Sequence, residues 1–269
     1  MSENGPCRIR LTFRKEEPLK YISHLDLLRA WERMLRRAGL PVAYSQGFNP
    51  HMKVTIAMPL PVGCTGEREI ADVIVKERLA PDRIVAALVP ACPEGMAVVD
   101  AREVPLQGPA MPGLIRQATY RLTLSGISEQ KVRQRVAMLL EQRQVQVQFR
   151  DQSFDLRPLV HSVAVNVLPT QGACATEAVR EKSGTRGDAG MRLLDHGGLS
   201  MSAAGRTSPC PGEKAVILDA VLLRDERGRI GRPDVLLEAL GLGEYAVGMC
   251  RTAILFDEPH FDHSISSSS

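Results

Sequence analysis

The first half of the chain is organised by one stretch, Ser23-His-Leu-Asp-Leu-Leu-Arg-Ala-Trp-Glu-Arg-Met-Leu-Arg-Arg-Ala-Gly39. Its large apolar residues recur every three or four positions, which places them on one side of an α-helix. Ser23 followed three residues later by Asp26 forms a capping box, which begins a helix. Gly39 and Pro41 then end it. The stretch predicts an amphipathic helix over residues 23–38.

The segments around this helix read as strands and predict an α+β fold. Residues 7–14 alternate apolar and polar side chains, as a half-buried strand does. Further strands are predicted at residues 53–58, 69–76 and 96–103, and a short helix at residues 81–88. This is the β-α-β-β-α-β order of a ferredoxin-like unit.

The same order recurs after residues 104–116, which hold three prolines and two glycines and predict a linker. Beyond it, strands are predicted at residues 119–124, 145–149, 160–168, 215–224 and 246–256, and helices at residues 128–143 and 232–240. We therefore predict two tandem ferredoxin-like sandwiches, the first over residues 1–103 and the second over residues 117–256.

Two segments lack the apolar periodicity of a packed element. Residues 171–213 are rich in Gly, Ala, Ser and Thr, and residues 257–269 end in four serines. Such compositions bury too little apolar surface to offset the entropy of ordering. We predict a disordered insertion in the second half and a disordered tail.

Composition excludes several classes of protein. The six cysteines are at least 28 residues apart, so no zinc knuckle and no three-cysteine iron–sulfur motif is present. The N-terminus is polar, and no apolar run approaches the roughly 20 residues of a membrane span. We expect a cytoplasmic protein without a membrane partner, a metal or a cofactor.

The positive charge is concentrated around the helix at residues 23–38. Residues 20–53 contain six Lys or Arg and two acidic residues, a balance of +4, whereas the whole chain carries +3. The rest of the chain is therefore at −1. A local basic surface on a near-neutral protein predicts a specific site for an anion.

Four arginines lie on the polar side of the predicted helix, and guanidinium groups bind phosphate and carboxylate through paired N–H donors. The alternative is a solvated helix face, partly neutralised by Asp26 and Glu32. The turn after the helix supplies further polar side chains. The candidate anion- or substrate-binding residues are Lys20, Tyr21, Ser23, His24, Arg29, Arg33, Arg36, Arg37, Tyr44, Ser45, Gly47, Phe48, Asn49, His51 and Lys53.

Phe48, the two histidines and two further arginines need separate interpretation. Phe48 either plugs the edge of the core, the interpretation that we favour because exposed Phe is costly, or presents a ring for stacking. His24 and His51 are candidate acid–base groups, although a lone His more often has a structural role. Arg157 and Arg251 are secondary candidates: a structural ion pair is the alternative for Arg157, and Arg251, inside a predicted strand, must point outward or find an anion.

The same residues carry a resemblance to a known family. Lys20-Tyr-Ile-Ser-His-Leu-Asp-Leu-Leu-Arg-Ala-Trp-Glu-Arg33, Arg36-Arg-Ala-Gly-Leu-Pro41 and Tyr44-Ser-Gln-Gly-Phe-Asn-Pro-His51 resemble the radical-SAM-linked protein family, a bacterial domain of unknown function. The resemblance continues through residues 59–63 and, more weakly, at residues 155–158, 232–233 and 251–252. It implies a separate radical SAM protein as partner, in which the iron–sulfur chemistry would take place.

Three functions follow as hypotheses. The first is an accessory protein that docks to a radical SAM enzyme and presents an anionic substrate, expected to be RNA. The second is an RNA-processing or RNA-modifying enzyme that uses His24 or His51 as an acid–base group. The third is a protein–protein adaptor whose arginines meet an acidic patch. Because no catalytic constellation is recognisable, the enzyme hypothesis is the less favoured of the first two.

Overall fold

The structure is a computed structural model that describes residues 5–167 and 215–257, and its fold is mixed α+β. The described strands are β1 (Cys7–Lys15), β2 (Val54–Ile56), β3 (Cys64–Val75), β4 (Met96–Val104), β5 (Ile115–Leu124), β6 (Gln146–Phe149), β7 (Gln152–Asp155), β8 (Val160–Val167), β9 (Val216–Leu223) and β10 (Ala246–Phe256). The α-helices are α1 (His24–Arg37), α2 (Pro81–Leu88), α3 (Glu129–Glu141) and α4 (Pro233–Ala239). Short 3-10 turns are η1 (Glu17–Leu19), η2 (Val89–Ala91), η3 (Met111–Leu114), η4 (Arg157–Leu159) and η5 (Gly243–Tyr245).

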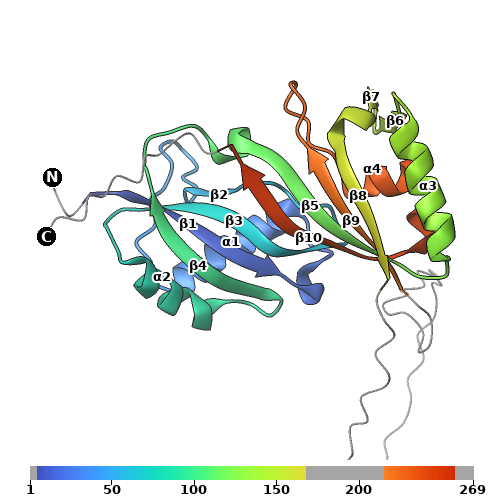
Figure 1. The fold of residues 1–269 in the computed structure, drawn as a ribbon. Coiled ribbons are helices and arrows are strands. Elements are labelled where there is room, and N and C mark those ends of the chain that lie inside the picture. Colours follow the sequence, from blue (N-terminus) through green and yellow to red (C-terminus); the bar gives the residue numbers. More distant parts are fainter. Residues whose placement is uncertain (1–4, 168–214, 258–269) are drawn as a thin grey trace, which may run out of the picture.

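One mostly antiparallel sheet runs through both halves of the molecule. Its strand order is β4-β1-β3-β10-β5-β9-β8, and β2 pairs with β3 (Figure 1). The last strand, β10, lies between the halves. It pairs antiparallel with β5 and, over Met249–Arg251, parallel with β3. The two halves therefore share one sheet, which the sequence pattern did not predict, because periodicity shows which face of a strand is buried but not which free edges pair.

The first half has its core between its strands and α1 and α2. Leu27, Trp31 and Met34 of α1 are buried, as the helical periodicity predicts. The Trp31 ring meets Phe13 of β1 edge to face, with 5.0 Å between the ring centroids. This packing fixes which side of α1 faces the sheet, and it turns the arginines of the helix toward solvent.

The second half packs α3 and α4 against β5, β8 and β9, with Tyr120 and Leu122 of β5 in the core. One predicted strand behaves differently. Residues 146–149 form a separate hairpin with β7 and do not join the main sheet. The strict alternation of these residues correctly predicts a strand. Its pairing partner, β7, follows it directly in the sequence and was not predicted.

The connection between the halves is not a free linker. It includes η3, where Met111 is fully buried and packs with Ala57 and Ile115 in a third apolar cluster. The predicted insertion at residues 171–213 and nearly all of the predicted tail lie outside the described residues. Within residues 5–167 and 215–257, no helix has the length and apolar character that crossing a membrane requires.

Candidate functional site

The helix that carries the predicted motif begins as the sequence indicates. The Ser23 hydroxyl accepts a hydrogen bond from the backbone N–H of Asp26 at 3.2 Å and donates to the Asp26 carboxylate at 2.7 Å. These contacts satisfy an N–H that the helix leaves unpaired. Ser23 is thus the N-cap residue of α1.

The four arginines of α1 have different surroundings. Arg29 forms an ion pair with Asp26 at 3.0 Å, and Arg37 donates to the backbone carbonyl of Ala91 in η2. Arg33 and Arg36 are exposed, and neither side chain has a hydrogen bond or ion pair with another described residue. The predicted row of four therefore leaves two guanidinium groups fully available to an anion.

Lys20 and Tyr21 lie just before α1 and differ in exposure. Lys20 is buried, and its Nζ forms an ion pair with the Glu17 carboxylate at 2.8 Å and lies 5.1 Å from the centre of the Tyr21 ring. The hydrogen bond to Glu17 raises the pKa of Lys20. Because this ammonium group is already neutralised, it is not the free cation that the sequence predicted. Tyr21 remains exposed.

The turn after α1 is a hairpin closed at its base. Tyr44 and Met52 form an antiparallel bridge, and Ser45 and His51 exchange two hydrogen bonds, of 2.8 and 2.9 Å. Gly47 has a φ of 125°, a conformation that a residue with a Cβ rarely adopts. This backbone leaves Phe48 fully exposed at the tip. The favoured interpretation of Phe48 as a core plug is therefore wrong.

The remaining residues of this hairpin are also accessible. Asn49, His51 and Lys53 are exposed, and the backbone N–H of Lys53 donates to Ala43. We call residues 44–53 the Phe48 hairpin. It combines two aromatic rings (Tyr44 and Phe48), one cation and polar groups at the surface, which is the chemistry that an RNA strand or an acidic peptide meets.

The two candidate histidines are separate features. His24 is the first residue of α1, and its Nδ1 is buried without a hydrogen-bond partner. Burial lowers the pKa of the His24 imidazole, so the neutral form is favoured at pH 7. His51 lies on the Phe48 hairpin. Among the described residues, neither histidine has a hydrogen bond from its ring to an acid or a nucleophile.

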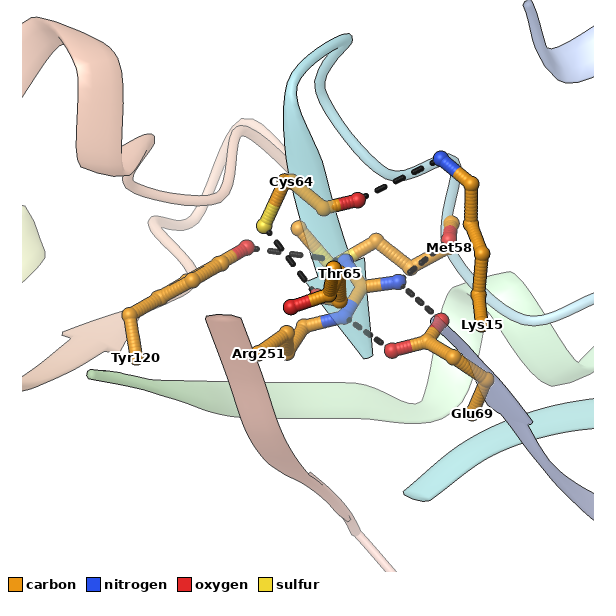
Figure 2. Close-up of polar contacts among 7 residues, drawn as sticks. All are labelled: Lys15, Met58, Cys64, Thr65, Glu69, Tyr120 and Arg251. Atoms are coloured by element: carbon orange, nitrogen blue, oxygen red, sulfur yellow. Dashed lines mark hydrogen bonds and ion pairs between the residues drawn. The ribbon is translucent and has the colours of Figure 1, made fainter. Parts of the chain in front are cut away.

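Arg251 has a buried structural role rather than a role in ligand binding. Its guanidinium forms a two-pronged ion pair with Glu69 of β3 and donates to the carbonyl of Met58 at 2.6 Å (Figure 2). Its Nη1 lies 3.5 Å from the Tyr120 hydroxyl. Burial opposes the charged form, but Glu69 and Tyr120 outweigh it and the pKa of Arg251 is raised. Arg157 likewise donates to backbone carbonyls, those of Leu140 and Val160.

The polar cluster around Arg251 continues into the wall of a cavity. The buried Lys15 ammonium donates to the carbonyls of Lys20 and Cys64, at 3.1 and 3.3 Å. Burial lowers the pKa of Lys15 and raises that of the Cys64 thiol to about 12. The Lys20 carbonyl also accepts from the N–H of Gly63, so Lys15 holds this segment in place.

Sequence reasoning missed Glu69 and Lys15. A Cβ at Gly66 would lie 2.6 Å from Glu69, so this glycine leaves the space in which the carboxylate sits. The available signal was Arg251 itself, because a guanidinium inside a buried strand needs an anion. The periodicity of residues 64–75 does not identify which acid supplies it.

A cavity of about 690 Å³ lies between the two halves beside this cluster. The first half contributes Lys20, Tyr21 and Gly63, and the second contributes residues 125–126 and 244–249. Three exposed apolar side chains belong to the segments around it: Tyr21, Leu25 and Val62.

Comparison with known families agrees with the position of the motif. Residues 8–188 match the family described as uncharacterized proteins conserved in bacteria (DUF2344), and the chain belongs to that family. A search of curated proteins finds no match. The matched range includes α1 and the Phe48 hairpin, and it confirms the predicted resemblance to a bacterial domain of unknown function.

Proposed function

We propose that this protein is a non-catalytic accessory protein that holds single-stranded RNA on the outer face of α1 and the Phe48 hairpin. The observation that carries the proposal is the exposed ring of Phe48, held on an ordered hairpin that follows a helix with two unpaired arginines. Aromatic rings bind unpaired bases by stacking, while guanidinium groups bind the phosphates. Both kinds of group are available at this surface without rearrangement of the core.

We also propose a radical SAM enzyme, in a separate chain, as the partner that acts on the bound RNA. The motif at residues 20–53 supports this part through its resemblance to the radical-SAM-linked family. Tyr21, Leu25 and Val62 are suitable docking residues because they expose apolar surface that a protein partner would cover. In this arrangement the chain positions the substrate and the partner supplies the chemistry.

A tandem ferredoxin-like origin of the fold is part of the same proposal. In the first half β1 lies between β4 and β3, and β2 pairs with the far edge of β3. In the second half β5 lies between β10 and β9, with β8 beyond. The two patterns are alike and support a repeated unit whose halves later joined through β10. Fold likeness to RNA-binding modules remains an analogy.

RNA binding is tested by fluorescence anisotropy with a labelled single-stranded oligonucleotide. The double variant Arg33→Glu, Arg36→Glu is expected to weaken binding at least tenfold and to flatten its dependence on salt, because two phosphate contacts are lost. The matched control reverses two exposed charges on the second half, Lys131→Glu and Arg143→Glu. Equal loss in both variants would point to nonspecific attraction, and no binding by the wild type would reject the proposal.

One observation favours the enzyme as a second candidate. His24 holds a buried, unpartnered ring nitrogen and a lowered pKa, which is the state of a general base at neutral pH. If His24 or His51 is catalytic, replacing it with Ala abolishes RNA turnover and leaves RNA affinity unchanged. If the wild type itself does not process RNA, the enzyme hypothesis is rejected and the accessory role is supported.

The adaptor hypothesis differs from the RNA-binding hypothesis in what Arg33 and Arg36 bind. An adaptor would retain its partner through Arg33 and Arg36 and would show no salt-dependent affinity for RNA. Purification of the tagged full chain from its own host, followed by mass spectrometry and RNA sequencing of what is retained, distinguishes the two. Recovery of a radical SAM protein without RNA would favour the adaptor.

A further inference from the structure

A second basic surface lies on the face of the sheet that α1 does not cover. Ile9, Leu11 and Phe13 of β1 are in the core with α1, so the alternating residues Arg8, Arg10 and Thr12 face the opposite side. The strand register then places Arg10 directly between Asp72 of β3 and Arg102 of β4. This surface is separate from the RNA site proposed above, which lies on the outer side of α1.

The surface contains a cavity of about 360 Å³ where β3 and β10 separate. The two strands are paired only at residues 64–66 and 249–251. Beyond that point, Arg68 and Ile70 of β3 and residues 253–256 of β10 line the gap, together with Arg10 and Arg102. The size is within the range of pockets that hold small organic ligands, about 300–1,000 Å³. We call this cavity the splay pocket.

The splay pocket has an excess of positive charge. Its lining contains three arginines (Arg10, Arg68 and Arg102) and one acid (Asp100), a balance of +2. The carboxylate of Asp72 is buried and accepts hydrogen bonds from both Arg8 and Arg10. Arg10 donates two of them, at 2.9 and 3.0 Å. Among the described residues, Arg68 and Arg102 have no hydrogen bond or ion pair.

The position of Arg102 is unfavourable for stability alone. Arg10 and Arg102 are direct cross-strand partners, and like charges in that position destabilise a sheet. Of the two nearby carboxylates, Asp72 is already shared by Arg8 and Arg10, and Asp100 forms no ion pair with a described arginine. A bound anion between Arg10, Arg68 and Arg102 would remove the repulsion and use their free N–H donors.

The apolar part of the splay pocket determines what kind of anion fits. Ile70, Leu255 and Phe256 are among its lining residues, and the Arg10 guanidinium lies 5.4 Å from the centre of the Phe256 ring. A flat ring can pack against these side chains while its phosphate lies between the arginines. An inorganic ion would use only the arginines and leave the apolar side exposed.

From this geometry we infer that the splay pocket binds a nucleotide, with the phosphate between Arg68 and Arg102 and the base against Ile70, Leu255 and Phe256. The ligand is either a free nucleotide or a terminal, phosphate-bearing nucleotide of RNA. This inference is independent of the RNA site on α1, since the two surfaces share no residue.

Isothermal titration calorimetry of the full chain with AMP tests the inference. The wild type is expected to bind AMP more tightly than inorganic phosphate or adenosine, because each of these lacks half of the contacts. Arg68→Gln and Arg102→Gln should each weaken AMP binding at least tenfold. Arg143→Gln, at an exposed arginine of the second half, is the matched control and should leave AMP affinity unchanged. Thermal melting checks folding, and Arg102→Gln should melt at or above the wild-type temperature.

The outcomes separate the two sites and the two sources of nucleotide. Competition of AMP by a 5′-phosphorylated oligonucleotide, but not by its dephosphorylated form, supports an RNA end. Failure of both to compete supports a free nucleotide. Absence of AMP binding at millimolar concentration, or equal AMP affinity of Arg102→Gln and wild type, overturns the inference. Loss of RNA binding on Arg33→Glu, Arg36→Glu with AMP binding intact would leave both proposals standing.

Discussion

Arginine has opposite roles at two places in this protein. Arg251 is fully buried between the halves and is bound to Glu69, Tyr120 and the Met58 carbonyl. Arg33 and Arg36 on the outer face of α1 are exposed and have no partner among the described residues. An arginine that the sequence singles out is therefore not by that alone a ligand-binding residue. Its surroundings decide whether its donors are already used.

Replacing Arg251 is expected to have the largest effect on stability, and it tests the contrast between buried and exposed arginines. Arg251→Met leaves the Glu69 carboxylate buried without a partner, and breaking such a pair costs about 3–5 kcal/mol in the free energy of unfolding. Arg33→Met, a change of the same chemistry at the surface, should stay within about 0.5 kcal/mol of wild type. Urea unfolding followed by circular dichroism measures both. Similar costs for the two variants would contradict the division into structural and free arginines.

A second comparison sets the Phe48 ring against an exposed apolar residue outside the motif. Phe48→Ala should reduce RNA affinity by about 1–3 kcal/mol, the contribution of one stacked base, without changing the melting temperature. Met138→Ala on α3 removes an exposed apolar side chain of the second half and should change neither. Anisotropy titration and thermal melting provide the two readouts. A fall in melting temperature for Phe48→Ala would restore the core-plug interpretation.

A smaller effect on stability is expected from removing the N-cap serines of α1 and α3, which can be compared directly. Ser23→Ala is expected to cost about 1 kcal/mol, since it removes the hydrogen bond to the Asp26 N–H. Ser128 caps α3 in the same way through the N–H of Lys131, at the longer distance of 3.4 Å. Ser128→Ala should therefore cost no more than Ser23→Ala. Denaturant unfolding compares them, and a larger cost at Ser128 would contradict the ranking.

The smallest expected effect is the pH dependence contributed by His24. Its pKa is lowered by burial in the folded protein, so the unfolded chain binds more protons as the pH falls below about 6.5. The stability contribution is complete above that value and is lost as the pH falls toward the folded pKa. His24→Gln should remove this part of the pH dependence, whereas His51→Gln should not. Unfolding free energies measured from pH 5 to 8 distinguish them; an unchanged pH profile in His24→Gln would reject this role.

Much of the local structure followed from the sequence. The helix at α1, its cap at Ser23 and its end at Gly39 are as predicted, because caps and apolar periodicity act over a few neighbouring residues. The short helix over residues 81–88 and the alternating strand β1 also agree. The side of α1 that faces the core was readable for the same reason, and with it the exposure of Arg33 and Arg36.

Contacts between distant segments were not readable. The pairing of β10 with β3 joins residues about 185 positions apart, and it decides that the halves share one sheet and that Arg251 meets Glu69. The exposure of Phe48 was unpredictable for the same reason, because it depends on the pairing of the base of its hairpin with β3.

Local sequence patterns were thus enough to predict most of the secondary structure, the amphipathic helix and the concentration of positive charge at residues 20–53. Which of those charges are free, which side chains surround the cavities and how the halves join became apparent only in the folded protein. The two kinds of property differ in range. Propensity, capping and periodicity are properties of adjacent residues, whereas burial and charge pairing depend on which strand edges meet after folding.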